Sequence, residues 1–224
     1  MRRAAAAALC LILLSCGPEP SGAPSGDTVS FTAADGVELV GDLRGGGETA
    51  VVLLHMYPSD RTAWFPFAEA LAAEGHTVLT FDFRGYGDSE GERQVGEIWR
   101  DALAAVRFMR RRGHERVVLV GASMGGTAAL ITAAREPLAG LVTLSAPSTF
   151  MGLTIPPEAV ELIEEPKLFV AAEGDAPAAA AAQQLYALAP APKEVEVVEG
   201  SEHGIGLVGS GEVRLLVLRF VRDL

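Results

Sequence analysis

The feature that most constrains the fold is a serine placed between two glycines directly after a short apolar run. Residues 117–120 read Val-Val-Leu-Val, which suits a central parallel strand buried on both faces, and residues 127–134 read as a helix. Ser123 lies in the turn between them, flanked by Gly121 and Gly125. A serine in such a tight strand-to-helix turn must adopt a strained backbone that projects its hydroxyl above the sheet. The pattern therefore predicts an exposed nucleophile.

The start of the predicted helix adds favourable electrostatics beside Ser123. The amide of Met124 lies at the helix amino end, where N–H groups lack partners and the helix dipole is positive, so it can donate to a developing oxyanion. A Gly-x-Ser-x-Gly pattern also occurs in turns without catalysis, so the order of the other candidates matters. Asp175 and His203 both follow Ser123, each directly after a strand-like run. This order of serine, acid and histidine is one that triads use.

The amino-terminal residues have the pattern of a secretion signal. Arg2 and Arg3 precede an apolar run over residues 4–14 that is too short to span a bilayer, which predicts a signal peptide over residues 1–15. The run ends Leu-Leu-Ser-Cys, which is similar to the bacterial lipobox and implies lipidation of Cys16. We therefore expect an extracytoplasmic protein anchored to a bacterial membrane. Ordinary signal cleavage nearby, without modification of the cysteine, is the alternative.

The rest of the chain divides into a tether and one domain. Residues 16–27 are rich in Pro, Gly and Ser and predict a solvated tether. Residues 28–224, roughly 200 residues, suffice for one domain with an adequate core. The only cysteines are Cys10 and Cys16, so this domain can contain no disulfide and depends on packing.

The charge balance bears on possible partners. The formal net charge is −11, and removal of Arg2 and Arg3 with the signal peptide would make it more negative. Nucleic acid is therefore not an expected partner, and the domain itself should not adhere to anionic lipid. Membrane attachment then rests on the lipid at Cys16.

Strand-like and helix-like segments alternate along the domain. Residues 29–32 and 37–43 read as a hairpin at the sheet edge, around a turn at residues 33–36. The other predicted strands are 50–54, 78–83, 117–120, 141–145, 167–172 and 194–198, and the predicted helices cover 64–71, 98–109, 127–134, 178–188 and 213–220. This alternation predicts an α/β fold with a doubly wound, mostly parallel sheet.

Four motifs give the domain its resemblance to a known family. They are His-Met-Tyr-Pro at 55–58, the segment 81–89, Gly-Ala-Ser-Met-Gly-Gly at 121–126, and Gly-Asp at 174–175 paired with Glu-His-Gly at 202–204. With these motifs the sequence resembles the α/β-hydrolase superfamily over essentially its whole predicted domain. The resemblance implies the α/β-hydrolase fold. The first motif usually reads His-Gly, so Met56 is a departure that puts the geometry of this loop in question.

The resemblance also implies roles for five residues. Ser123 would be the nucleophile, His203 the general base, and Asp175 the carboxylate that orients the imidazole. The backbone amides of Tyr57 and Met124 would form the oxyanion hole. A contact through the Tyr57 hydroxyl, or a role as a pocket wall alone, are the alternatives for that residue.

Other polar residues compete for these roles. Glu173 could replace Asp175 as the acid, and His55 would support the oxyanion loop in the resembling family without taking the proton. Structural or solvated roles are expected for His76, His114, Asp82, Asp88, Ser145 and Ser148. The sequence holds no cluster with metal-ligand spacing and no Gly-rich phosphate loop, so we expect neither a metal nor a cofactor.

Substrate identity is the least constrained property. The segment 151–166, where relatives usually insert a lid, has room for at most one short helix and predicts a minimal cap. Its apolar residues could line an acyl pocket or form a small packed cap: Met151, Leu153, Ile155, Val160 and Leu162.

Three classes of function fit the sequence. The first is a lipid-anchored serine hydrolase that cleaves carboxylic esters, or thioesters, lactones or amides, as small-molecule acyl substrates. The second is a non-catalytic binding lipoprotein on a retained hydrolase fold, which Met56 and the minimal cap keep open. The third is another chemistry on this fold, such as peptidase or perhydrolase activity.

Overall fold

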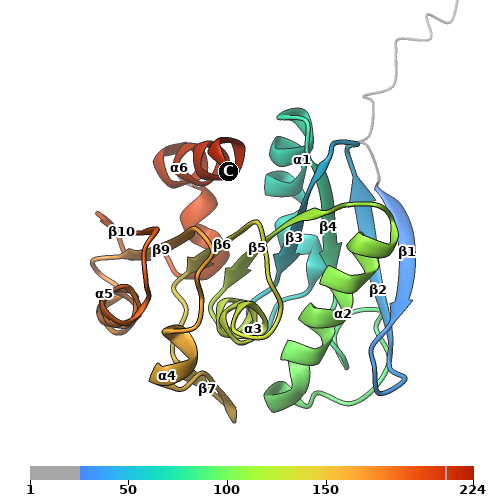
Figure 1. Cartoon of the computed structure of the whole chain (residues 1–224), viewed down its shortest axis with the longest axis horizontal. Helices are drawn as coiled ribbons and strands as arrows, with labels where there is room; N and C mark the ends of the chain where they lie inside the picture. The colour runs from blue at the N-terminus through green and yellow to red at the C-terminus, as the bar shows by residue number, and fades with distance from the viewer. Residues whose placement is uncertain (1–25, 210) are drawn as a thin grey trace, which may run out of the picture.

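A mostly parallel sheet runs through the centre of the computed structural model, which describes residues 26–209 and 211–224 (Figure 1). The described residues form eight hydrogen-bonded strands in the order β1-β2-β4-β3-β5-β6-β9-β10. Within this eight-stranded sheet, only the described pairs β1–β2 and β2–β4 are antiparallel. The strands are β1 (Asp27–Thr32), β2 (Glu38–Arg44), β3 (Thr49–Leu54), β4 (Thr77–Phe81), β5 (Arg116–Ala122), β6 (Gly140–Leu144), β9 (Lys167–Ala172) and β10 (Lys193–Val198). The predicted doubly wound fold and its edge hairpin are confirmed.

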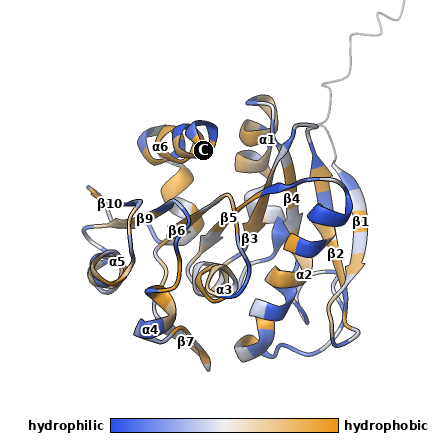
Figure 2. Cartoon of the chain, viewed as in Figure 1, coloured by the Kyte–Doolittle hydropathy of each residue, from blue (hydrophilic) through white to orange (hydrophobic). Residues whose placement is uncertain are grey.

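Helices cover both faces of the sheet. In Figure 1, α1 (Phe65–Ala73) and α6 (Gly211–Asp223) lie on one side, and α2 (Ile98–Arg111), α3 (Met124–Ala133) and α5 (Ala176–Leu188) lie on the other. The side chains of β3 alternate between the two layers, since Val52 belongs to the core on the α3 side and Val51 to the core on the α1 side. Figure 2 shows the apolar colour concentrated on the central strands and on α3. Burial on both faces explains why these strands read as continuous apolar runs.

The topology reverses beside β3, and this reversal positions the site. The chain passes from β3 to β4 on one side, and later returns to place β5 on the other side of β3. The loops that follow β3 and β5 therefore diverge at the carboxyl ends of these strands. Such a switch point is where open α/β sheets bind their ligands.

Two local features differ from the sequence prediction. Helix α3 begins at Met124 and not at Thr127, because Ser123 itself takes the N-cap position. The sequence also gave no sign of the short hairpin formed by β7 (Thr149–Phe150) and β8 (Leu153–Thr154), since two-residue strands carry no readable period. Short helical segments complete the chain: η1 (Arg61–Trp64), η2 (Val95–Glu97), η3 (Gly204–Gly209) and α4 (Pro157–Val160).

The cap is small and mostly packed. Leu153, Ile155 and Val160 are buried and join the same core cluster as α3, which supports the packed-cap interpretation for these residues. Met151 and Leu162 are instead exposed, at 63% and 67% of their surface. The cap therefore leaves the carboxyl edge of the sheet largely open.

The predicted signal peptide, Cys16 and nearly all of the predicted tether lie outside the described residues. Within the described ranges, no helix has both the length and the apolar character needed to cross a bilayer. The first strand begins at Asp27, next to the predicted tether boundary.

Two buried arginines differ sharply in their partners. Arg84 is almost fully buried, and its guanidinium nitrogens lie 2.6 Å from Asp101 Oδ1 and 2.7 Å from Asp35 Oδ2. Burial raises the pKa of the Asp101 carboxyl, although its hydrogen bonds with Arg84 oppose this effect. Arg44 is 9% exposed, and in the described part of the chain it forms no ion pair. Its guanidinium lies 3.9 Å from the centre of the Phe65 ring and donates to Thr80 Oγ1 at 3.3 Å.

We predict opposite sensitivities at these two positions. Arg84→Met should lower the free energy of unfolding by about 3–5 kcal/mol, because it leaves the buried Asp101 carboxylate uncompensated. Arg44→Met should be close to neutral, because it removes a buried charge that has no carboxylate partner. Urea denaturation of the two variants beside the wild type measures the difference. Equal losses in both variants would contradict this account of the Arg84 cluster.

Candidate active site

The candidate residues lie on loops that leave adjacent strands at the same edge of the sheet. Leu54 of β3 pairs with Gly121 of β5, so the segments after these two strands start at the same level. The Ser123 amide donates to Leu144 O of β6 at 2.8 Å, which extends this alignment to the next strand. The candidate site therefore lies at the carboxyl edge of the sheet, at the switch point.

Ser123 has the strained backbone that the sequence predicts. Its φ is 47° and its ψ is −114°, in a region that residues with a side chain rarely adopt. Such a conformation costs about 1–3 kcal/mol, so the surrounding structure must hold it in place. The side chain makes no cap hydrogen bond to α3. Among the described residues its hydroxyl has no hydrogen-bond partner. The residue is buried, with 7% of its surface exposed, and is therefore not the exposed nucleophile that the sequence predicts.

The glycines around Ser123 are required by close backbone contacts. A Cβ on Gly125 would lie 2.3 Å from Leu54 O, and a Cβ on Gly121 would lie 2.4 Å from Gly125 O. Helix α3 therefore starts in direct contact with the end of β3. This contact brings the loop after β3 beside Ser123.

Asp175 and His203 form the clearest polar pair at this edge. Asp175 follows β9 at the N-cap of α5, His203 follows β10, and Asp175 Oδ2 lies 2.5 Å from His203 Nδ1. Glu173, the alternative acid, is exposed and makes no side-chain hydrogen bond within the described residues. The pairing assigns the Nδ1 proton to the carboxylate contact and leaves His203 Nε2 as an acceptor. The His203 side chain is 43% exposed, so the site is open to solvent.

The loop that carries His203 is held by a residue that sequence reasoning placed only in a turn. Gly204 N donates to Ser145 Oγ at 3.1 Å, and the Ser145 amide donates to Val170 O of β9 at 2.8 Å. Ser145 is fully buried, with a φ of 55°. Its position at the carboxyl end of a buried strand was the only sequence signal for this role.

His55 links the loops after β3 and β4. The Phe83 amide donates to His55 Nε2 at 3.1 Å, so the ring proton is on Nδ1, which lies 3.1 Å from Met56 O. Burial lowers the pKa of His55, and the Met56 carbonyl and the Asp82 carboxylate oppose that shift. Both ring nitrogens are engaged, so His55 supports the loop and is not available as a base for Ser123.

Two backbone amides at this edge of the sheet have no hydrogen-bond partner among the described residues. Met124 N is the first amide of α3, and neither it nor Tyr57 N donates a hydrogen bond in the ranges that the structure describes. The Tyr57 side chain is 41% exposed, and its ring centre lies 5.9 Å from that of Phe150 in the cap hairpin. Tyr57 thus combines a free amide with a ring that forms part of the site's wall.

An arginine that the sequence did not mark fixes the loop after β4. Arg61 donates to Asp42 Oδ2 at 2.7 Å, to Asp88 Oδ2 at 2.8 Å, and to the buried Asp82. Asp82 also accepts from the Asp88 amide at 2.9 Å, and a Cβ on Gly87 would lie 2.0 Å from Asp82 Oδ2. Asp82 and Asp88 have the expected structural roles. No spacing pattern in the sequence could have identified Arg61 as their common partner.

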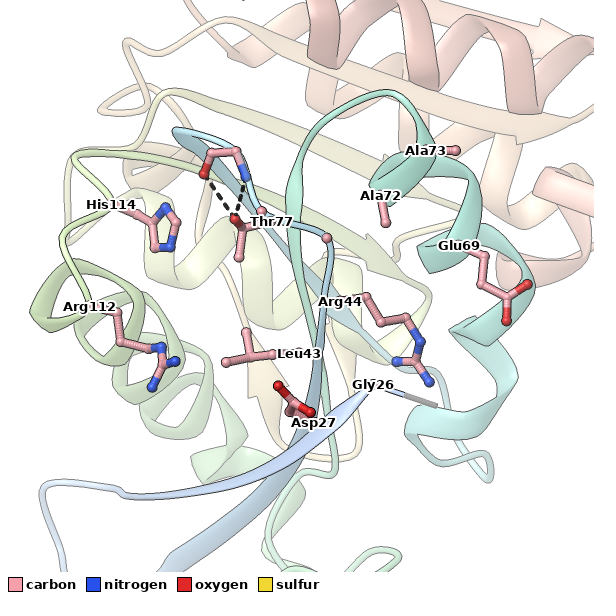
Figure 3. Close-up of a pocket in the computed structure, with 13 residues that line it drawn as sticks. Gly26, Asp27, Leu43, Arg44, Glu69, Ala72, Ala73, Thr77, Arg112 and His114 are labelled. Atoms are coloured by element: carbon pink, nitrogen blue, oxygen red, sulfur yellow. Dashed lines mark hydrogen bonds between the residues drawn. The ribbon is translucent and has the colours of Figure 1, made fainter. Parts of the chain in front are cut away.

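A cavity of about 690 Å³ lies away from these residues. Figure 3 shows Arg44, Thr77 and His114 among its lining residues, which are located where β2 ends and where β4 and β5 begin. This is the edge of the sheet opposite to Ser123. The cavity is therefore separate from the candidate active site.

No group of three or more His, Cys, Asp or Glu side chains suitable for a metal ion lies among the described residues. The expectation that the protein needs no metal or cofactor stays a prediction.

Comparison with known proteins places this geometry in a family. Residues 49–162 match the family described as alpha/beta hydrolase fold, and the chain belongs to that family. It is similar to the uncharacterized protein Rv2307c of Mycobacterium tuberculosis H37Rv, with 30% identity over 92% of this chain and 83% of that protein. It is also similar to the serine hydrolase BPHL of Mus musculus, with 37% identity over 49% of this chain and 39% of that protein.

A solved structure supports the same fold. The esterase Pf2001 of Pyrococcus furiosus superposes with a TM-score of 0.78 over 88% of this chain and 92% of its own, at 22% sequence identity. At this identity the likeness concerns the fold. Membership of the family supports a hydrolase.

The buried His55 predicts a dependence of stability on pH. An unfolded histidine has a pKa of about 6.5, and the folded value is lower, so below about pH 6.5 the unfolded chain binds a proton that the folded chain does not. The free energy of unfolding should therefore fall as the pH is lowered from about 6.5 toward the folded pKa. His55→Asn should be less stable at neutral pH. Below about pH 6.5, however, its free energy of unfolding should fall less steeply with decreasing pH than that of the wild type.

Urea denaturation between about pH 7.5 and 5 measures how the free energy of unfolding changes with pH in the wild type and in His55→Asn. Burial also lowers the pKa of His76, but this residue is present in both proteins and cancels in the difference. Equal slopes would contradict the assignment of a neutral, buried His55.

Proposed function

We propose that the protein is a serine hydrolase that cleaves carboxylic esters or related acyl compounds through Ser123, His203 and Asp175. The observation that carries the proposal is the 2.5 Å contact between Asp175 Oδ2 and His203 Nδ1, on loops at the same sheet edge as the strained Ser123. A carboxylate, an imidazole and a serine hydroxyl gathered at a switch point have the composition of a catalytic triad.

In the proposed first half of the reaction, Ser123 Oγ attacks the carbonyl carbon of the substrate while His203 Nε2 accepts the hydroxyl proton. The Asp175 carboxylate stabilises the imidazolium that forms. The same proton then passes to the leaving alcohol as the carbon–oxygen bond breaks, which leaves an acyl group on Ser123. Ser123 and His203 must come within hydrogen-bond reach when substrate binds, as is common for sites without ligand.

The two free amides suit the negative charge of the tetrahedral intermediate. Met124 N lies at the positive end of the α3 dipole, and Tyr57 N lies on the loop held by His55. Loss of one such donor typically lowers turnover by about 100- to 1,000-fold, so the pair would supply a large part of the catalysis.

The second half of the reaction repeats these steps with water. His203 Nε2 takes a proton from water, whose oxygen attacks the acyl carbon, and then returns the proton to Ser123 Oγ. The carboxylic acid leaves and the free enzyme is restored.

Carboxylic esters are the proposed substrate class, with thioesters, lactones and amides as competitors. The open site and the small packed cap favour a substrate that does not need a deep enclosed pocket. The names of two similar proteins, an esterase and a serine hydrolase, agree with this choice.

We predict that a fluorophosphonate probe labels the protein at Ser123. Ser123→Ala should abolish labelling and lower ester hydrolysis by roughly 10⁶-fold, while the circular dichroism spectrum and melting temperature show that the fold is kept. His203→Ala should also lose labelling. Short- and medium-chain p-nitrophenyl esters provide the activity measurement.

Ser148→Ala is the matched control for this experiment, because Ser148 is an exposed serine near the next strand end and lacks flanking glycines. It should label and hydrolyse like the wild type. Labelling that persists in Ser123→Ala would overturn the assignment of the nucleophile. A folded wild type that neither labels nor hydrolyses would favour a binding protein on this fold, and labelling without ester hydrolysis would favour peptidase or perhydrolase chemistry.

We also propose that the mature protein is anchored outside the cytoplasm by a lipid on Cys16. The support is the basic start, the short apolar run and the Leu-Leu-Ser-Cys sequence that ends at this cysteine. A lipidated cysteine followed by a Pro-, Gly- and Ser-rich tether would hold the domain near the membrane surface.

Expression of the full chain in a bacterial host with labelled palmitate tests the anchor. The wild type should incorporate label and fractionate with membranes, whereas Cys16→Ser should do neither. Cys10→Ser is the matched control, since it changes the chain's only other cysteine and lies inside the predicted signal peptide. Label that survives in Cys16→Ser would exclude this site of modification.

A further inference from the structure

Met56 belongs to a site motif, and the proposed reaction gives it no role. It occupies the place where the resembling family usually has glycine, in the loop between His55 and Tyr57. Its carbonyl lies 3.1 Å from His55 Nδ1 and accepts from Ser59 N at 2.9 Å, so its backbone is well fixed. Its side chain is partly buried and packs against the core cluster on the α1 side of the sheet.

The side chain of Met56 reaches the loop that carries His203. A Cβ added to Gly204 would lie 2.8 Å from Met56 Sδ, 3.7 Å from Met56 Cε and 3.4 Å from Ala122 Cβ. Gly204 is buried and has a φ of 57°. The large side chain at position 56 and the missing side chain at position 204 therefore fit one another.

This contact matters because the His203 side chain itself has little packing. The ring is 43% exposed, and its hydrogen bond to Asp175 fixes the ring orientation but not the height of the loop above Ser123. The next residue, Gly204, is held by a hydrogen bond to Ser145 Oγ on one side and by Met56 and Ala122. Ala122 directly precedes Ser123, so Gly204 lies against the start of the Ser123 turn as well as against Met56.

We propose that Met56 is a positioning residue that holds the His203 loop against the Ser123 turn and joins it to the oxyanion loop. This inference rests on the proposed serine hydrolase function. A glycine at position 56 would leave the space beside Gly204 without side-chain contacts, and the loop would lose the dispersion contacts that keep it in place. Met56 thus links the loop of His203, the proposed general base, to the loop that carries the Tyr57 amide.

The test is a comparison of Met56→Gly, Met56→Leu and the wild type in p-nitrophenyl ester hydrolysis. Met56→Gly should lower kcat by on the order of 10- to 100-fold with little change in KM, because small displacements of a catalytic group act on the chemical step. Met56→Leu should restore most of kcat, since it refills the space. Leu215→Ala, which truncates an exposed leucine on α6, is the control for loss of an apolar side chain and should keep the wild-type kcat.

A double-mutant cycle tests the contact itself and separates positioning from general stability. Gly204→Ala should lower kcat strongly beside Met56, because its Cβ would lie against Met56 Sδ, and should cost less in a Met56→Ala background. Urea denaturation of each variant shows whether the effects on kcat exceed those on folding.

A folded Met56→Gly protein that hydrolyses esters with the wild-type kcat would overturn the positioning role while leaving the proposed function intact. Additive effects of Gly204→Ala and Met56→Ala would overturn it as well. A wild type that neither labels with fluorophosphonate nor hydrolyses esters would overturn both proposals, because an unactivated serine needs no positioned histidine.

Discussion

The close contact between the start of α3 and the end of β3 is the constraint on which the rest of the site depends. Gly125 lies so near Leu54 O and His55 O that no side chain can be accommodated there. This contact allows Ser123 to keep a backbone conformation that would otherwise relax, and it places the loop after β3 beside the serine. The free amide at the start of α3 lies directly after Ser123, so the backbone strain and the electrostatics at this serine both depend on the contact between α3 and β3.

Around this contact, buried polar groups fix the loops that a hydrophobic core cannot fix. His55 joins the loop after β3 to Phe83, Arg61 joins η1 to the loop after β4, and Ser145 joins the end of β6 to the loop of His203. Each is buried or nearly so, and each bridges segments that are distant in sequence. These hydrogen bonds add to the apolar packing of the loops and hold the candidate catalytic groups at defined positions.

The candidate site is exposed to solvent, although its residues are held at defined positions. Leu153, Ile155 and Val160 pack the cap segment against the core on the α3 side, and the His203 side chain remains exposed. The candidate catalytic residues are therefore held in position by the sheet edge and the loops packed on it, and not by an enclosing lid. Met56 contributes to this support, because its side chain lies against Gly204.

The sequence by itself determined the fold class, because buried parallel strands read as apolar runs and the helices between them have their own period. It also determined the serine turn, since Gly121 and Gly125 flank Ser123 directly after an apolar run, and the order in which Asp175 and His203 follow. Only the tertiary structure decided that Asp175 and not Glu173 meets His203, that Ser145 holds the histidine loop, and that Arg61 is the partner of three carboxylates. It likewise decided that Met56 fills the space at Gly204. These are contacts between loops from different strands, and their geometry depends on strand order and register, which local sequence patterns do not encode.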